Sequence, residues 1–309
     1  GSHLAKRLLD LGLTVVGLDC LDETLYPAAL HREQLAPLLA RPRFQFVEGD
    51  ILSAGLLAEL TKEASAVIHL AALAGVRPSL AQACRYMRCN VEGTQNVLAA
   101  CRQQGIRRIV FASSSSVYGA HSAVPFREED PAVRPASPYA ASKRAGELLC
   151  ATHCDLYGGA IAALRFFTVY GPHQRPEMAI ASFAARILRG ETVFLHGSGD
   201  SARDYTYIDD IIDGIVAALH KTNDDSLGLR CYNLGGEHTT TLRELVRLLE
   251  SALGSPARIE WRPDQPGDVP ITWASLERSR RELDYSPKVA IQQGIVRYCD
   301  WLKARRDNV

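Results

Sequence analysis

Short apolar runs alternate with longer amphipathic stretches along the first 171 residues of the chain. The runs are TVVGLD at 14–19, FQFVEGD at 44–50, AVIHLAA at 66–72, RIVFASSSS at 108–116 and AIAALRFF at 160–167. Runs that are almost continuously apolar are typical of parallel strands covered by helices on both faces. The stretches between the runs, such as 90–105 and 137–158, are long enough for helices. The pattern therefore predicts a doubly wound α/β domain over residues 1–171.

The regular alternation fades after Gly171. Prolines interrupt the pattern at positions 172, 176, 256, 263, 266 and 270, and the apolar runs CYNLGG and RIEW are short. We expect a smaller α/β substrate-binding domain over residues 172–309, and we expect a segment near 204–236 to return to the first sheet.

The first residues read as a helix, because Leu4, Leu8 and Leu11 share one face and Gly12 ends the pattern. Asp19 follows Gly1 by 18 residues and ends an apolar run. In a dinucleotide-binding βαβ unit, a glycine-rich turn opens the first helix and an acidic residue follows about 20 residues later. The spacing predicts that Gly1 is the last glycine of such a turn, with the first strand of a Rossmann sheet before it. The alternative is that Gly-Ser-His remains from a cleaved purification tag.

Composition narrows the function classes. The 309 residues carry 35 Lys+Arg and 35 Asp+Glu, a net charge of +0, and nucleic-acid or membrane-surface partners would favour a basic excess. We also find no apolar run near the ~20 residues of a membrane span. The eight cysteines form no C-x-x-C pair, and the histidines show no ligand spacing. We therefore predict no metal, and we predict reduced thiols in a cytoplasmic protein.

The strongest chemical signal is SPYAASK, which places Tyr139 and Lys143 four residues apart. On a helix this spacing puts both side chains on one face, and an ammonium beside a phenol favours the phenolate. Four serines, Ser113–Ser116, end the run 108–116, and the carboxyl ends of parallel strands are where α/β sheets bind ligands. Serine, tyrosine and lysine in this order predict a proton-transfer site.

These motifs identify a family resemblance. The ordered landmarks are GSHLAKRLL, GDI at Asp50, VIHLAA, NVEGT, SSSSVYG, PYAASK, LRFFTVYGP, RDYTYIDD and QPGDVP. Together they resemble the extended short-chain dehydrogenase/reductases that epimerise nucleotide sugars with NAD. The run RFFTVYGPHQRPEMA at 165–179 is most similar to the UDP-glucuronate 4-epimerases.

The resemblance implies roles for individual residues of this chain. Ser114, Tyr139 and Lys143 would be catalytic, with Tyr139 as the acid/base and Lys143 lowering its pKa. The implied NAD-binding residues are Gly1, Asp19, Asp50, Ile51, Leu70, Ala71, Ala72, Asn90, Tyr139, Lys143 and Phe166. The implied substrate-binding residues are Ser114, Ser115, Ser116, Thr168, Arg175, Ala179, Arg203 and Asp268, of which Arg203 and Asp268 would hold the uridine diphosphate.

The implied reaction is the 4-epimerisation of a UDP-sugar through a transient 4-keto intermediate. The alternatives are a UDP-glucose or UDP-N-acetylglucosamine 4-epimerase, a nucleotide-sugar dehydratase or decarboxylase, and a non-catalytic dinucleotide-binding homologue. Similar dehydratases carry Asp-Glu immediately after the catalytic residue, whereas Ser115 and Ser116 occupy these positions here. Hydroxyls of serine do not exchange protons near pH 7, so the sequence disfavours loss of water.

Arg175 is the residue on which the choice of sugar depends. A guanidinium matches a carboxylate with two parallel bonds, which favours UDP-glucuronate as the substrate. The alternatives are that Arg175 contacts the diphosphate or pairs with Glu177. The resemblance also implies a homodimer, in which the helices around 91–101 and 140–151 would form a four-helix bundle with a second copy.

Overall fold

The computed structural model describes residues 1–120, 123–263 and 269–306. Parallel strands form two separate groups, β1-β2 and β3-β4-β5-β9. Their bounds are β1 Val15–Asp19, β2 Phe44–Glu48, β3 Val67–His69, β4 Arg108–Ser114, β5 Ala160–Phe166 and β9 Gly228–Leu234. Every pairing within these two groups is parallel. The predicted α/β fold with parallel sheets is confirmed.

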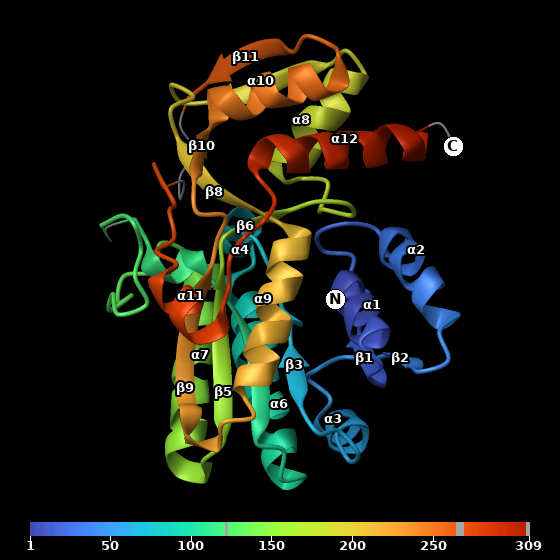
Figure 1. The fold of residues 1–309 in the computed structure, drawn as a ribbon, viewed down its shortest axis with the longest axis vertical. Coiled ribbons are helices and arrows are strands. Elements are labelled where there is room, and N and C mark those ends of the chain that lie inside the picture. The colour runs from blue at the N-terminus through green and yellow to red at the C-terminus, as the bar shows by residue number, and fades with distance from the viewer. Residues whose placement is uncertain (121–122, 264–268, 307–309) are drawn as a thin grey trace.

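Helices cover both faces of the four-stranded group. The helices of this part of the protein are α1 Ser2–Asp10, α2 Ala28–Leu39, α3 Ala54–Leu60, α4 Val76–Ala81, α5 Ala83–Met87, α6 Gly93–Gln103, α7 Pro138–Tyr157, α9 Ile208–Lys221 and α11 Glu277–Leu283. α6 and α7 pack on one face of the four-stranded group and α9 on the other, whereas α2 packs on α1 and β2. A π-helical turn, Arg88–Glu92, leads into α6. Figure 1 shows the β1-β2 pair beside α1 and α2 on the right of the view, with β3 at the centre and β5, β9 and α7 on the left.

Strand residues alternate between two apolar layers, as the period of two in a strand requires. Val110 packs with residues of α1 and α9, whereas its neighbours Ile109 and Phe111 pack with residues of α6 and α7. This alternation explains the continuous apolar pattern of the strands in the sequence. It also places the end of β4 between the two helical layers.

The segment 204–236 contains α9 and β9. β9 pairs with β5 along its whole length, from Gly228 beside Ala160 to Leu234 beside Phe166. The apolar residues of α9, including Ile211 and Ile215, join the cluster that contains Val110. This part of the chain therefore lies on and within the four-stranded sheet.

The remaining elements form a smaller unit above the sheet in the view of Figure 1. They are β6 Thr168–Tyr170, β7 Thr192–His196, β8 Ala202–Tyr207, β10 Thr239–Thr241, β11 Arg258–Arg262, α8 Ala179–Leu188, α10 Leu242–Leu253 and α12 Ile291–Arg306. β8 pairs with β6 and β10, and β7 pairs with β11. Apolar residues of α8, α10 and α12 form a core of their own with these strands.

The helices in the described residues include none that is both long and apolar enough to cross a membrane. All eight cysteines are free, and four of them are buried. Of the other four cysteines, Cys20 and Cys84 are exposed, and Cys89 and Cys231 are half-buried.

Candidate active site

Ser114 ends β4 and begins a short 3-10 turn, Ser115–Tyr118. Its side chain is 7% exposed, and its Oγ accepts a hydrogen bond of 3.2 Å from the backbone N–H of Ser116. The strand end therefore holds the Ser114 hydroxyl in a fixed place. That place is the carboxyl edge of the parallel sheet, where α/β folds bind ligands.

Helix α7 brings Tyr139 to this hydroxyl. Ser137 caps the helix by accepting from the backbone N–H of Ala140 at 3.1 Å, and Pro138 occupies the first helical position. Both features favour a helix that begins here, so Tyr139 lies on its first turn. The phenol of Tyr139 is hydrogen-bonded to Ser114. The structure thus brings together two of the three predicted catalytic side chains directly.

Lys143 lies one turn further along α7 and is almost completely buried. Its Nζ donates a 2.8 Å hydrogen bond to the backbone oxygen of Ala112, on β4. Burial lowers the pKa of Lys143 to about 8. Helix α7 can approach β4 closely at Gly146, because any Cβ there would overlap Phe111. The packing of α7 against β4 therefore holds Tyr139 and Lys143 at the sheet.

The pKa of Tyr139 differs from the sequence expectation. Burial raises it, and only partial compensation comes from the Ser114 hydrogen bond and the positive charge of Arg175. We expected Lys143 to lower this pKa. The ammonium is instead directed to the Ala112 carbonyl and is itself poorly solvated, which weakens its stabilisation of a phenolate.

A buried ion pair lies behind the strand end. The Glu147 carboxylate accepts from Arg165 Nε and Nη2 at 2.8 and 2.9 Å, and from the Ser113 hydroxyl at 2.6 Å. Both charged side chains are at most 2% exposed. The pair ties α7 to β5 and to the residue next to Ser114. Sequence reasoning missed Glu147, although its position four residues after Lys143 puts it on the same helical face.

Arg175 lies in the loop between β6 and α8 and is half-buried. Its Nη1 donates to the backbone oxygen of Ala74 at 3.3 Å and pairs with Glu177 at 2.9 Å. Its charge acts on Tyr139 and opposes the rise in the pKa of that phenol. The pairing with Glu177 was one of the alternatives left open by the sequence, and it coexists here with a position near the proposed acid/base.

Asn90 stands inside the molecule and is 2% exposed. It bonds both backbone groups of Leu73, accepting from the N–H at 2.8 Å and donating to the oxygen at 2.9 Å. It also donates to Ser142 Oγ at 2.9 Å, and that hydroxyl donates to the backbone oxygen of Tyr139 at 2.7 Å. Asn90 therefore links the turn after β3 to the catalytic helix.

Two carboxylates lie at neighbouring strand ends. Asp19 ends β1, and Asp50 follows β2, with the Gly49 N–H donating to the Asp19 backbone oxygen at 3.0 Å. Each carboxylate accepts one local backbone bond, from Leu21 and Leu52 respectively, both at 2.9 Å. Both side chains belong to exposed residues, so their remaining oxygens are accessible to a ligand.

Gly1 precedes α1 at its N-cap. It lines a cavity of about 200 Å³ together with Tyr26, Gly171 and His173, among other residues. The cavity lies between the start of α1 and the segment after β6, so residues from both ends of the predicted first domain contribute to it.

The other predicted residues are spread along the same edge of the sheet and into the smaller unit. Half-buried positions are occupied by Leu70, Ala71, Ala72, Ser115, Ser116, Phe166, Thr168, Ala179 and Arg203, and a buried position by Ile51. Arg203 lies on β8 and donates to the Ala202 backbone oxygen at 3.0 Å. Asp268 falls outside the described residues.

The family model described as "NAD dependent epimerase/dehydratase family" matches residues 1–235. This chain belongs to that family. The family expected from the sequence motifs is therefore confirmed. The match includes all the strand-end residues and all of α7.

Relatives within the family include isomerases and a dehydratase. UDP-glucuronate 4-epimerase 4 of Arabidopsis thaliana is 41% identical over 97% of this chain and 72% of that protein. The crystal structure of UDP-glucuronic acid 4-epimerase from Bacillus cereus with UDP-glucuronic acid and NAD is 36% identical, with a TM-score of 0.92, 99% of this chain and 96% of that chain covered. The dTDP-glucose 4,6-dehydratase DesIV from Streptomyces venezuelae, with NAD and TYD bound, is 33% identical, with a TM-score of 0.91 and coverages of 99% and 94%.

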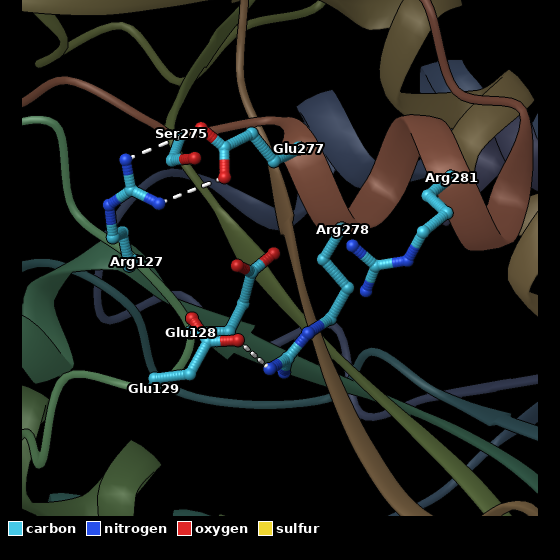
Figure 2. A pocket seen from close by; sticks show the side chains of 7 residues that line it. All are labelled: Arg127, Glu128, Glu129, Ser275, Glu277, Arg278 and Arg281. Atoms are coloured by element: carbon cyan, nitrogen blue, oxygen red, sulfur yellow. Dashed lines mark hydrogen bonds and ion pairs between the residues drawn. The ribbon is translucent and has the colours of Figure 1, made fainter.

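A second pocket has a volume of about 90 Å³, and none of its lining residues belongs to α7. Figure 2 shows its lining residues, which are Arg127, Glu128, Glu129, Ser275, Glu277, Arg278 and Arg281. Ion pairs join Arg127 to Glu277 and Arg278 to Glu129. The charges are balanced, so the pocket offers no excess charge to a ligand of either sign.

The described residues contain no group of three or more His, Cys, Asp or Glu side chains that could hold a metal ion. His69 illustrates the point. It is 6% exposed, its Nε2 lies 3.0 Å from Thr94 Oγ1, and burial lowers its pKa to about 3. His69 is thus a neutral core histidine with a hydrogen-bond partner.

Proposed function

We propose that this protein interconverts UDP-glucuronate and UDP-galacturonate by NAD-dependent 4-epimerisation. The observation that carries the proposal is that Arg175 shares the Ala74 carbonyl with Tyr86, whose ring lies against Tyr139, while Tyr139 bonds Ser114. A guanidinium next to the acid/base of a sugar C4 hydroxyl lies within one sugar ring of a C6 carboxylate. Two of the relatives described above are UDP-glucuronate 4-epimerases by name, which supports the same choice of sugar.

The residues present suit NAD. Asp19 offers accessible carboxylate oxygens at the end of β1, the position from which an acid bonds ribose hydroxyls, and a carboxylate there disfavours the 2′-phosphate of NADP. Asp50 stands at the neighbouring strand end, and the cavity beside Gly1 lies at the start of α1. When bound, NAD supplies a reversible acceptor for the C4 hydride, so that the sugar passes through a 4-keto form.

Proton transfer is the task of the chain's own residues. Ser114 donates to or accepts from the C4 oxygen, and Tyr139 moves the hydroxyl proton. Burial raises the pKa of Tyr139. Positive charge near the phenol opposes this rise and favours the phenolate. Lys143, held at Ala112, keeps a cation one helical turn from the phenol. Arg175 orients the sugar by its carboxylate and opposes the rise in the Tyr139 pKa.

A dehydratase is the second candidate, because DesIV is structurally similar. The residues after Ser114 favour an epimerase over a dehydratase. Ser115 and Ser116 form the first residues of a 3-10 turn and carry hydroxyls only, which cannot serve as a second acid/base pair near pH 7. A 4-epimerase for a neutral UDP-sugar remains the alternative that experiment must separate.

We further propose a homodimer formed through α6 and α7, and the division into domains at residues 171 and 172. Leu148 and Leu156 on α7 are 55% and 66% exposed, which supports burial against a second copy. The eight free thiols support a reducing compartment such as the cytoplasm.

The proposed reaction is tested by incubating the protein and NAD with UDP-glucuronate, UDP-glucose and UDP-N-acetylglucosamine separately, and by resolving the C4 epimers. We expect UDP-galacturonate from UDP-glucuronate, with the highest kcat/KM of the three. In deuterium oxide the product should carry no deuterium at C4, because the hydride returns to the same carbon. Conversion of neutral sugars alone, or release of water from the sugar, would contradict the proposal.

A further inference from the structure

Tyr86 occupies the space between the catalytic helix and the turn after β3. It lies on α5 and has 0% exposure. Its ring meets that of Tyr139 edge-on, with ring centres 6.3 Å apart and planes at 85°. This is the geometry that aromatic pairs prefer, so Tyr86 restricts the ring orientation of the proposed acid/base.

The hydroxyl of Tyr86 points the other way, to the turn. It donates a 2.8 Å hydrogen bond to the backbone oxygen of Ala74. The same oxygen accepts from Arg175 Nη1 at 3.3 Å. One carbonyl therefore receives both donors, and the Ala74 oxygen links the Tyr86 hydroxyl to the Arg175 guanidinium.

The turn itself is held from a second side. Asn90 bonds both backbone groups of Leu73, and the next residue but one, Gly75, has a φ of +105° that favours glycine. A Cβ at Gly75 would lie 3.5 Å from Arg175 Nη1. The guanidinium thus rests on a backbone turn whose position is set by Asn90 and whose carbonyl is fixed by Tyr86.

The hydroxyl of Tyr86 remains a donor through the working pH range. Burial raises its pKa to about 12, and the charge of Arg175 opposes this rise only in part. A neutral phenol beside Arg175 can donate to the carbonyl without competing for the positive charge. A charged or mobile side chain at position 86 would disturb both the Ala74 carbonyl and the Arg175 guanidinium.

We propose that Tyr86 is a positioning residue that fixes the orientation of Arg175 relative to Tyr139 and thereby sets the preference for an acidic sugar. The proposal rests on the function proposed above, in which Arg175 binds the sugar carboxylate. Arginine has many rotamers, and ordering them on binding lowers affinity. A preordered guanidinium avoids that loss and keeps the sugar in line with the phenol.

The test compares UDP-glucuronate with UDP-glucose in the full-length chain supplied with NAD. Tyr86→Phe keeps the ring against Tyr139 and removes only the bond to Ala74. We expect kcat/KM for UDP-glucuronate to fall about 3- to 10-fold more than that for UDP-glucose, the scale of one lost hydrogen bond. The loss should lie in KM, because the ring contact that orients Tyr139 is retained.

Tyr232→Phe is the matched control. Tyr232 is equally buried. Its hydroxyl donates to Glu282 at 3.2 Å rather than to a residue that contacts Arg175. It should leave the ratio of the two kcat/KM values unchanged. Thermal unfolding of both variants shows that each is folded, and affinity for the two UDP-sugars in a Tyr139→Phe background gives the same comparison without turnover.

A double-mutant cycle with Arg175→Leu separates the two proposals. If Tyr86 acts through Arg175, Tyr86→Phe should change the sugar ratio little once Arg175 is leucine. An additive effect, or an equal loss on both sugars in Tyr86→Phe, overturns the positioning role while leaving the proposed function intact. If Arg175→Leu itself does not change the ratio, the proposed function fails and the positioning role fails with it.

Discussion

The Glu147 carboxylate and the Arg165 guanidinium face each other through two hydrogen bonds of 2.8 and 2.9 Å in the interior of the protein. Burial acts to raise the pKa of Glu147, but the bonds and charge of Arg165 outweigh it and lower the pKa. The carboxylate also accepts from Ser113, the neighbour of the proposed catalytic serine. The ion pair therefore stabilises the ends of β4 and β5 against α7.

We expect Glu147→Gln to lower the free energy of unfolding by about 3–5 kcal/mol, because Arg165 is left buried without its counter-charge. Denaturant titration measures this change. The matched control is Glu191→Gln, which breaks an exposed pair with Arg189 and should change the free energy of unfolding far less than Glu147→Gln does. The double change Glu147→Leu with Arg165→Met should cost less than the sum of the single changes, and strict additivity would contradict the coupling.

The Glu147 contribution has a defined pH dependence. A pKa lowered by folding means that the stabilisation is present above the ordinary glutamate pKa of 4.5 and is lost as the pH falls through the folded value. The difference in unfolding free energy between wild type and Glu147→Gln should therefore shrink at pH values below about 4.5. A difference that grows on acidification would show that another group carries it.

Tyr139→Phe should reduce turnover about 10²–10⁴-fold, the usual contribution of a general acid or base. The change removes one oxygen and keeps the ring that packs against Tyr86. Binding of UDP-sugar and the thermal unfolding temperature should change little, as calorimetry can check. If more than a tenth of the wild-type turnover remained, Tyr139 would not be the proton carrier.

Arg175→Leu should weaken transition-state binding of UDP-glucuronate by about 1.5–3 kcal/mol, the scale of hydrogen bonds to a charged group. UDP-glucose should lose much less, because it has no carboxylate for the guanidinium to bind. The ratio of kcat/KM values for the two sugars gives the result. Glu177→Gln, which removes the ion-pair partner of Arg175 at 2.9 Å, controls for loss of that pair alone. An equal loss on both sugars would place Arg175 at the diphosphate.

The contribution of Asp204 to the stability of the folded protein should decrease as the pH rises from 4 to 6. This fully buried carboxyl accepts from the backbone N–H groups of Gly236 and Ala274, yet burial outweighs these bonds and raises its pKa to about 6 from 3.8. The folded state then binds the proton more tightly than the unfolded state, so stability is greatest below pH 3.8 for this group and falls through pH 6. The full change is about 3 kcal/mol.

Asp204→Asn removes this titration. The stability of wild type relative to Asp204→Asn should therefore be higher at pH 4 than at pH 7, as denaturant titration at both values can show. Asp155→Asn, an exposed position on α7, should give the same difference at both pH values. A wild-type advantage that grows toward pH 7 would mean that Asp204 is ionised and well stabilised in the folded protein.

Sequence patterns predicted the parts of the site that depend on neighbouring residues. The serine run placed Ser114 at a strand end, and the four-residue spacing placed Tyr139 and Lys143 on one face of a helix capped by Ser137. The hydrogen bond between Ser114 and Tyr139 follows once β4 and α7 pack together. These features depend on the short repeat periods of helices and strands, and on the common carboxyl edge of parallel strands. Both can be inferred from the pattern of a single sequence.

Contacts between distant segments could not be predicted in this way. Tyr86 and Tyr139 are 53 positions apart in the sequence, and no motif marks Tyr86, although it precedes Asn90 by four residues. The Ala74 carbonyl offers no side-chain signal at all. The direction of the Tyr139 pKa shift was also wrong, because the bond from Lys143 to Ala112 and the degree of burial depend on the packed structure.

The proposed proton-transfer residues Ser114, Tyr139 and Lys143 all lie within the single unit β4-α7-β5, whereas Arg175 comes from a loop that begins only after β6. Mutations can therefore accumulate in that loop without disturbing the packing that aligns the hydroxyls. Such an arrangement allows the range of accepted sugars to diverge between descendants of one ancestor while the chemistry is inherited. In laboratory evolution toward a new UDP-sugar, libraries confined to residues 171–179 should yield altered preference at little cost in turnover.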